Sequence, residues 1–202
     1  MKEKEILERV NQLFMQNGIK SMTMDEISRQ LGISKKTLYQ YVSNKKELVK
    51  KVIELAIEEK QDCISQFYDP KKNAIDILME ITAFVQSTMK ELHPSVIFDL
   101  KKYHLEAWKI MKDHDEKFIY ANIKANIEHG IEEGLYRDNI KPEIITHFYL
   151  AMVNTIIDPD ILAGSNFSGL EVHTEMMRYH IRGIASNKGR EYLKSKFSQG
   201  HE

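Results

Sequence analysis

Two adjacent lysines near residue 35 are the first residues whose types and spacing suggest a binding chemistry. They lie in the stretch "MDEISRQLGISKKTLYQYV", residues 24–42, where Gly32 separates two helix-like runs. Ser34 is a good N-cap, so Lys35 and Lys36 should occupy the first turn of a new helix. Cationic side chains on such a turn can donate hydrogen bonds to guanine edges and to DNA phosphates. The stretch therefore predicts a contact with nucleic acid.

The apolar positions of this stretch predict the two helices that would carry the lysines. A capping box of Thr23 and Glu26 should open the first helix, which we expect to run from about Met24 to Leu31 and to end at Gly32. Two short helices joined by a glycine-containing turn are typical of a helix-turn-helix. The apolar positions are Ile27, Leu31, Ile33, Leu38 and Tyr41, with the small Ser28 where the helices must approach closely. The residues left facing outward are Lys35, Lys36, Tyr39, Gln40 and Ser43.

The charge of this region differs from the charge of the whole chain. Between Lys20 and Lys51 there are eight basic and three acidic residues, a local excess of five positive charges. The formal total is −1, so the rest of the chain carries −6. A localised basic segment favours DNA binding through one face, whereas solvated surface lysines are the ordinary alternative.

The rest of the chain is predicted to be helical. Only 9 glycines and 4 prolines occur in 202 residues, which leaves few turns for strands and predicts an all-α fold. Apolar spacing predicts a first helix over residues 5–15, and Asn44 with Glu47 should open a connecting helix over about 44–67. Further helices are expected over about 72–92, 95–103, 105–133, 142–157 and 170–185, followed by a polar tail over 186–202.

The segment "MTMDEISRQLGISKKTLYQYVSNKKELVKKVI" resembles the DNA-binding segment of TetR/AcrR-type transcriptional regulators. In that family a threonine opens helix two, "TLY" lies on the recognition helix, and a lysine follows an aromatic-rich stretch. The chain's length, its helical pattern and the stretch "GLYRDNIKPEII" extend the likeness beyond this segment. The resemblance implies that Thr23, Tyr41 and Lys45 contact phosphates. It also implies base-reading or groove-lining positions for Lys35, Lys36, Thr37, Tyr39 and Gln40.

Two positions depart from the family's pattern. Lys36 stands where many members have glycine or another small residue, which alters the expected target sequence rather than the binding. Val42 replaces a common phenylalanine and should leave a slightly smaller core contact. We expect a helix-turn-helix domain over residues 1–46, joined through the helix of about 44–67. A helical effector-binding and dimerisation domain is expected over 47–202.

The resemblance also implies a small-molecule effector and a homodimer. A pocket among the middle helices would suit a largely apolar or aromatic ligand. Its candidate residues are Phe84, Phe98, Tyr103, Trp108, Met111, Phe148 and Met152. The candidate dimer residues are Ile144, Ile145, Phe148, Met152, Met176, Met177 and Ile184. Packing within a single chain would use the same residues, so that alternative stays open.

These features predict a dimeric repressor that binds an inverted-repeat operator in double-stranded DNA and leaves it when a ligand binds. A DNA-binding regulator without an effector is the first alternative, and an all-helical enzyme is the second. The chain has no nucleophile elbow, no phosphate-binding glycine loop and no HExxH motif, so neither catalytic residues nor cofactors are expected.

Histidine and cysteine placement predicts neither a metal site nor a disulfide. His173 and His180 are two helical turns apart, and His104 lies near Glu106, but neither spacing is that of a zinc motif. The single Cys63 has no partner for an internal disulfide. The N-terminus lacks an apolar signal-peptide block, and no stretch is long enough to span a membrane, so we expect a cytoplasmic protein. The family resemblance implies that it is bacterial.

Overall fold

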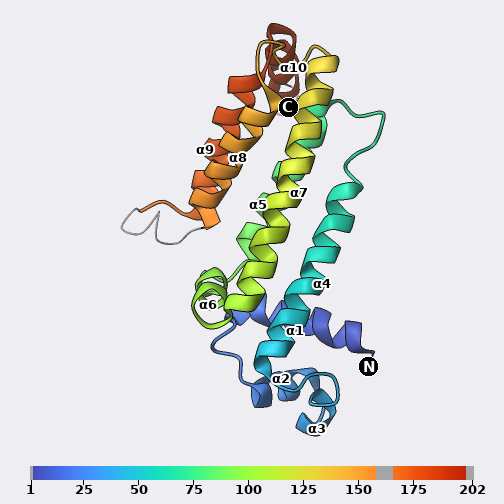
Figure 1. Cartoon of the computed structure of the whole chain (residues 1–202), viewed down its shortest axis with the longest axis vertical. Coiled ribbons are helices and arrows are strands. Elements are labelled where there is room, and N and C mark those ends of the chain that lie inside the picture. The colour runs from blue at the N-terminus through green and yellow to red at the C-terminus, as the bar shows by residue number, and fades with distance from the viewer. Residues whose placement is uncertain (1, 158–165, 199–202) are drawn as a thin grey trace. The chain divides into compact units, whose positions relative to one another are not determined.

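Helices form the regular structure of this chain. The computed structural model describes residues 2–157 and 166–198, and within them it has helices and one isolated bridge but no strand, which confirms the all-α prediction. Figure 1 shows the order of the helices. Their bounds are α1 Glu3–Asn17, α2 Met24–Leu31, α3 Lys35–Leu38, α4 Lys45–Ser65, α5 Ala74–Glu91, α6 Ser95–Tyr103, α7 Leu105–Glu132, α8 Pro142–Ile157, α9 Gly169–Ile184 and α10 Asn187–Ser198. None of these described helices is long and apolar enough to cross a membrane.

The chain divides into two compact units. Unit 1 consists of residues 1–63 and 91–115, and so combines the N-terminal helices with α6 and the first part of α7. Unit 2 consists of residues 64–90 and 116–202. Each unit has its own cluster of buried apolar side chains. The functional division expected at residue 46 stays a prediction.

α2 begins and ends, and α3 begins, where their capping signals predict. Of the capping box predicted for α2, only the bond to Thr23 forms, because the Glu26 carboxylate bonds Arg29 and Gln30 instead. Thr23 Oγ1 accepts a hydrogen bond from the Glu26 amide at 3.1 Å, and Gly32 ends α2 with a left-handed φ of 67°. Ser34 Oγ accepts from the Thr37 amide at 3.0 Å and opens α3. Since each cap joins residues three positions apart, the local sequence was sufficient to predict these ends.

The core of unit 1 joins α1, α2, α3 and α4. Val10, Ile27, Leu38 and Leu48 are completely buried in it. Val42, which stands in place of a larger family residue, is also buried, so the smaller side chain still packs into this core.

Unit 2 packs α5, part of α7, α8, α9 and α10 around a second core. Asn126 lies at its centre, where Nδ2 donates to the Ala74 carbonyl at 2.8 Å and Oδ1 accepts from the Tyr136 hydroxyl at 3.0 Å. Glu133 Oε2 accepts from the Ala74 amide at 2.9 Å, so a side chain that follows α7 caps the start of α5. These bonds satisfy polar groups that would otherwise be costly to bury.

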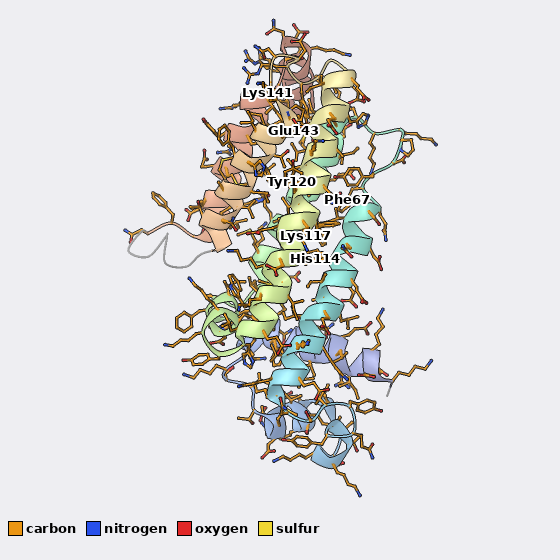
Figure 2. The ribbon with its side chains drawn as sticks, in the orientation of Figure 1. Phe67, His114, Lys117, Tyr120, Lys141 and Glu143 are labelled. Carbon is orange, nitrogen blue, oxygen red and sulfur yellow. The ribbon has the colours of Figure 1, made fainter. Side chains whose placement is uncertain are left out.

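Contacts between aromatic and charged side chains join α7 to α8. The rings of Tyr120 and His147 lie 5.3 Å apart between centroids. Lys124 Nζ lies 3.3 Å from Glu143 Oε1. Tyr120 and Glu143 are labelled in Figure 2, where they mark the two helices along this contact.

The C-terminal segment corrects the expectation of a polar tail over residues 186–202. Residues 187–198 form α10, and 199–202 lie outside the described residues. The Ser186 amide donates to the Leu135 carbonyl at 2.9 Å, and Ser186 Oγ accepts from the Gly189 amide at 3.1 Å. The second bond places Ser186 as the N-cap of this helix.

Contacts distant in sequence hold α10 against unit 2. A Cβ on Gly189 would overlap the Leu135 carbonyl, so only glycine permits this approach. The Tyr192 hydroxyl donates to Asp76 at 2.7 Å, across 116 positions of sequence. Because these partners are remote, the polar composition of the segment alone could not reveal them.

The close approach of Gly130 to the Tyr136 ring allows a test of packing in unit 2. A Cβ on Gly130 in α7 would overlap this buried ring. We expect Gly130→Ala to lower the free energy of unfolding by about 1–3 kcal/mol, because overpacking outweighs the better helix propensity of alanine. Gly183→Ala in α9 is the matched control, since nothing lies within 4 Å of its Cβ position, and it should be neutral or stabilising. Equal effects of the two substitutions in urea unfolding would contradict this packing.

His180 should make the stability of unit 2 depend on pH. Burial lowers the pKa of His180 to about 4, and its ring packs edge-on against Tyr149 at 4.9 Å. In the unfolded chain the His180 imidazole is protonated as the pH falls below about 6.5, whereas in the folded chain it stays neutral until about pH 4. Between these pH values protonation therefore favours the unfolded chain. We expect the free energy of unfolding to fall by about 1–2 kcal/mol between pH 7.5 and pH 5 on this account.

Replacing the ring tests this assignment. His180→Phe keeps an aromatic side chain against Tyr149 but cannot be protonated, so it should flatten the loss of stability between the two pH values. The measurement is urea unfolding at each pH, and an unchanged slope in His180→Phe would refute the assignment.

Candidate nucleic-acid interface

The second helix of the helix-turn-helix is shorter than the sequence pattern suggests. Regular α-helix ends at Leu38, although the outward-facing positions predicted from the sequence continue to Ser43. The chain continues in a tight turn. In it the backbone N–H of Gln40 donates to the Thr37 carbonyl at 3.2 Å, and the backbone N–H of Tyr41 donates to the Leu38 carbonyl at 3.1 Å. Hydrogen bonds of this three-residue spacing tighten the last turn and carry the chain towards the buried Val42.

The structure leaves most of the predicted base-reading side chains accessible. Lys35, Lys36 and Gln40 are exposed, and Tyr39 is 42% exposed. Thr37 is half-buried, with Oγ1 2.8 Å from Ser34 Oγ, so its hydroxyl already has a partner. Four side chains of α3 and the turn after it are therefore accessible for contact. They are the ammonium of Lys36, the ion-paired ammonium of Lys35, the side-chain amide of Gln40 and the phenol of Tyr39.

Most basic side chains between residues 20 and 51 have a carboxylate or another polar partner. The ion pairs join Lys35 to Asp25 (2.5 Å), Arg29 to Glu26 (2.7 Å), Lys50 to Glu106 (2.6 Å) and Lys51 to Glu3 (2.8 Å). In the part of the chain that the structure describes, Lys36 and Lys46 are exposed and make neither a hydrogen bond nor an ion pair. The free positive charge of the segment is therefore concentrated on the first turns of α3 and α4.

The structure adds Lys46 to the lysines predicted from sequence. It neighbours the predicted Lys45 in the same first turn of α4, but only Lys46 projects into solvent. A pair of adjacent lysines signals a basic helix start without showing which of the two side chains is free. That choice depends on the direction in which α4 leaves the preceding turn.

Lys45 is held by the turn between α1 and α2. Its ammonium donates to the Ile19 carbonyl at 2.7 Å and lies 3.4 Å from the Lys20 carbonyl. Burial lowers the pKa of Lys45, and the charge of Asp99 partly offsets this effect. An ammonium has three hydrogens, so one donor is left for a further partner such as a phosphate.

Thr23 and Tyr41 differ in how much of each side chain is accessible. Thr23 is exposed, and because its Oγ1 accepts from the Glu26 amide, its hydroxyl hydrogen can still be donated. Tyr41 is half-buried and packs against the core of unit 1.

Asp99 is part of this site although the sequence analysis did not identify it. This α6 residue is 3% exposed, and its Oδ2 accepts from the Ile19 amide at 3.1 Å, the Lys20 amide at 2.8 Å and the Ser95 hydroxyl at 3.2 Å. The amides lie 80 and 79 positions away in sequence, so no local signal could identify them.

The seven predicted pocket residues have different surroundings in the structure. Trp108 and Met111 pack against the core of unit 1, whereas Phe84 belongs to a small cluster in unit 2. Phe98 and Tyr103 are exposed and form an edge-to-face pair, with ring centroids 6.4 Å apart. Phe148 is exposed and Met152 half-buried on α8. These residues are thus divided between the two units, and the pocket stays a prediction.

The predicted dimer residues separate into a buried group and an exposed group. Met176, Met177 and Ile184 are buried in the core of unit 2, which is the packing within one chain that the sequence left open. Ile145 and Met152 are partly buried against the same core. The exposed members are Ile144 and Phe148 on α8. Tyr179 on α9, which is not among the predicted residues, is exposed as well.

An open, largely apolar groove lies along α8 and α9. Its volume is about 440 Å³. The groove residues are Met152, Thr155, Phe167, Glu171, Val172, Glu175, Met176 and Tyr179. Both carboxylates already have partners, since Glu171 accepts from Ser168 and Glu175 pairs with Arg178. The free surface of the groove is therefore apolar and aromatic.

Known proteins resemble this chain in both sequence and structure. Residues 6–52 match the family described as "Bacterial regulatory proteins, tetR family". An uncharacterized HTH-type transcriptional regulator of Bacillus subtilis (strain 168), YvaF, is 29% identical over 187 residues, which cover 92% of this chain and 97% of YvaF.

Solved structures share the fold over most of their length. A TetR-family regulator from Agrobacterium tumefaciens has a TM-score of 0.70 and 16% identity, covering 91% of this chain and 97% of that protein. A regulator from Saccharomonospora viridis, solved in complex with choline, has a TM-score of 0.69 and 14% identity, covering 92% and 98%. Together with the helix-turn-helix geometry, the family match assigns a TetR-type DNA-binding segment to residues 6–52, and the relatives support a TetR-type transcriptional regulator.

Proposed function

We propose that this chain is a dimeric repressor that binds an inverted-repeat operator and is released by a small, largely apolar or aromatic ligand. The observation that carries the proposal is the exposed start of α3 and the turn after it. There Lys36 makes no hydrogen bond or ion pair with any residue that the structure describes, and Gln40 lies four positions further on. A cation at the start of α3 and a side-chain amide in the exposed turn after it can donate to base edges without first breaking an intramolecular bond.

Residues at the start of α3 would read the major groove. Lysine donates to guanine O6 and N7, and glutamine can bond adenine N6 and N7. Lys36 and Gln40 are therefore the proposed base readers. Lys35, Thr37 and Tyr39 line the groove beside them, and Lys35 must exchange its bond to Asp25 for a DNA contact.

The surrounding residues would bind the phosphates. Thr23 offers a hydroxyl at the start of α2, and Lys45 offers the ammonium hydrogen that its two backbone partners leave free. Tyr41 is the third phosphate contact that the resemblance implies. We add Lys46, because it is exposed and has no intramolecular ion pair among the described residues. Phosphate contacts set the position of the protein on the duplex and supply most of its salt-dependent affinity. The DNA-binding domain would then comprise residues 1–46, joined through the helix of about 44–67 to the remainder, 47–202.

Selection of bound duplexes from a random DNA pool tests this proposal. We expect enrichment of an inverted repeat, because two symmetric reading helices require two half-sites. Lys36→Ala and Gln40→Ala should each shift the preferred base at one position of each half-site, at a cost of about 1–3 kcal/mol for the original sequence. Lys60→Ala in α4 is the control, since Lys60 is bonded to Asp115 away from α3. A pool that remains unenriched at moderate salt would refute sequence-specific recognition.

The exposed faces of α8 and α9 support a dimer. Ile144, Phe148 and Tyr179 are 47%, 61% and 74% exposed, and the apolar groove continues between the two helices. Large exposed apolar patches are uncommon on monomers and typical of subunit interfaces. Two copies related by a two-fold axis could bury these faces in a four-helix contact.

Phe148→Glu tests the dimer. A carboxylate placed in a buried interface without a partner is costly, so we expect the variant to be monomeric at concentrations where the parent protein is dimeric. Phe98→Glu is the matched control, because Phe98 is an exposed aromatic on α6 and should leave the mass unchanged. Sedimentation equilibrium would measure both masses. A dimeric Phe148→Glu would show that this face is not the interface.

An effector is supported by the similarity to a regulator solved in complex with choline. For this chain, the candidate pocket residues remain Phe84, Phe98, Tyr103, Trp108, Met111, Phe148 and Met152. Such a ligand would release DNA only if it binds better to a conformation with wrongly spaced reading helices. A regulator without an effector is the second candidate, and absence of thermal stabilisation across an apolar and aromatic ligand panel would favour it.

A further inference from the structure

Asp99 is a buried carboxylate that accepts hydrogen bonds from the backbone of the turn between α1 and α2. One oxygen, Oδ2, accepts from the amides of Ile19 and Lys20 and from the hydroxyl of Ser95. The two amides belong to the turn between α1 and α2, whereas Asp99 belongs to α6, and all three elements lie in unit 1. The carboxylate makes no ion pair with a cation in the described structure, so backbone donors supply much of its stabilisation.

The same turn is held from its other side by Lys45. Ile19 donates its amide to Asp99 at 3.1 Å and accepts the Lys45 ammonium on its carbonyl at 2.7 Å. A residue bonded on one side to an anion and on the other to a cation is polarised, and each bond strengthens the other. The position of the Lys45 ammonium therefore depends on where Asp99 holds Ile19.

Glycine at position 18 allows this contact to form. Gly18 ends α1 with φ of 79°, and a Cβ there would overlap Ser95 Oγ. The His93 amide donates to the Met15 carbonyl at 2.7 Å and closes the adjacent end of α1. The turn and the start of α6 thus approach closely enough for backbone and short polar side chains to bond, beside the apolar packing of Ile19 and Val96 in the core of unit 1.

Packing alone does not require a charge at this position. The apolar core of unit 1 already buries Val96 and Leu100, the neighbours of Asp99 on α6. A buried ionised group is often no more stabilising than a well-packed apolar one, so its presence favours a role in setting geometry.

We propose that Asp99 is a positioning residue for DNA binding, which fixes the turn at Ile19 and Lys20 and thereby places the Lys45 ammonium where it contacts phosphate. This inference rests on the proposed DNA contact of Lys45. Asp99 itself touches no DNA and acts through Ile19.

The test measures affinity for the selected duplex over a series of salt concentrations. Asp99→Asn keeps the shape of the side chain but removes its charge. We expect it to bind about ten-fold more weakly and to lower the salt slope by about one unit, because one phosphate contact is lost. Lys45→Ala should give the same slope, and the double variant should bind no more weakly than Lys45→Ala alone.

Two controls separate positioning from stability. Asp76→Asn removes comparable bonds to Tyr192 and Asn73 in unit 2, so it should lower stability but leave the salt slope unchanged. Lys46→Ala should lower the slope additively with Asp99→Asn, because Lys46 makes no bond to the Ile19 turn. A smaller fraction of folded protein lowers the apparent DNA affinity equally at every salt concentration, so it does not change the salt slope. The salt slope therefore distinguishes a positioning role of Asp99 from a loss of stability.

Amide exchange provides a second measurement that does not require DNA. Asp99→Asn should speed deuterium uptake at Ile19 and Lys20, whereas Asp76→Asn should not. If Asp99→Asn does not fold, Ser95→Ala removes the 3.2 Å bond to the same oxygen, together with the 3.0 Å contact of Ser95 Oγ with His93 Nδ1, and leaves the carboxylate in place. It should give smaller changes in both uptake and slope.

The outcomes distinguish this inference from the proposed function. A wild-type protein without salt-dependent DNA binding would overturn both. A normal wild-type slope that falls in Lys45→Ala but not in Asp99→Asn would overturn the positioning role and leave DNA binding intact. Additive losses in the double variant would also overturn it, because Asp99 would then act independently of Lys45.

Discussion

The backbone of the turn between α1 and α2 is the constraint on which unit 1 depends. Two consecutive amides, Ile19 and Lys20, point into the protein and need acceptors, and Asp99 supplies one oxygen for both. The Ile19 carbonyl in turn receives the Lys45 ammonium. Without these partners the turn would bury backbone polar groups that have no hydrogen bond, and this strongly destabilises the folded state. One carboxylate therefore links α6 to the start of α2 and to the start of α4.

The basic character of the N-terminal segment is less than its sequence suggests. Four of its cations are paired with carboxylates, and such exposed pairs contribute little to stability. These ion pairs leave only a few side chains of the segment with a positive charge that is not paired to a carboxylate. Lys36 and Lys46 occupy equivalent second positions in α3 and α4, so the charge remaining for a polyanion lies on two neighbouring helix starts.

Unit 2 shows how one helix can serve two kinds of packing. The face of α9 with His173, Met177 and His180 is buried within the chain, whereas Tyr179 on the opposite face is exposed. On α8, Tyr149 is buried while Phe148 beside it is not. Apolar residues on the inner face complete the core, so those on the outer face are left for a ligand or another subunit.

The sequence by itself determined the helix ends, the helix-turn-helix and the family likeness. Thr23, Gly32 and Ser34 act through bonds and backbone angles within three or four positions, so their effects could be predicted without the rest of the fold. Only the tertiary structure decided which lysines are free, that α10 forms, and that Asp99 holds the Ile19 turn. The reason is physical: helix caps are local, whereas ion pairing, burial and long-range hydrogen bonds depend on residues that folding alone brings together.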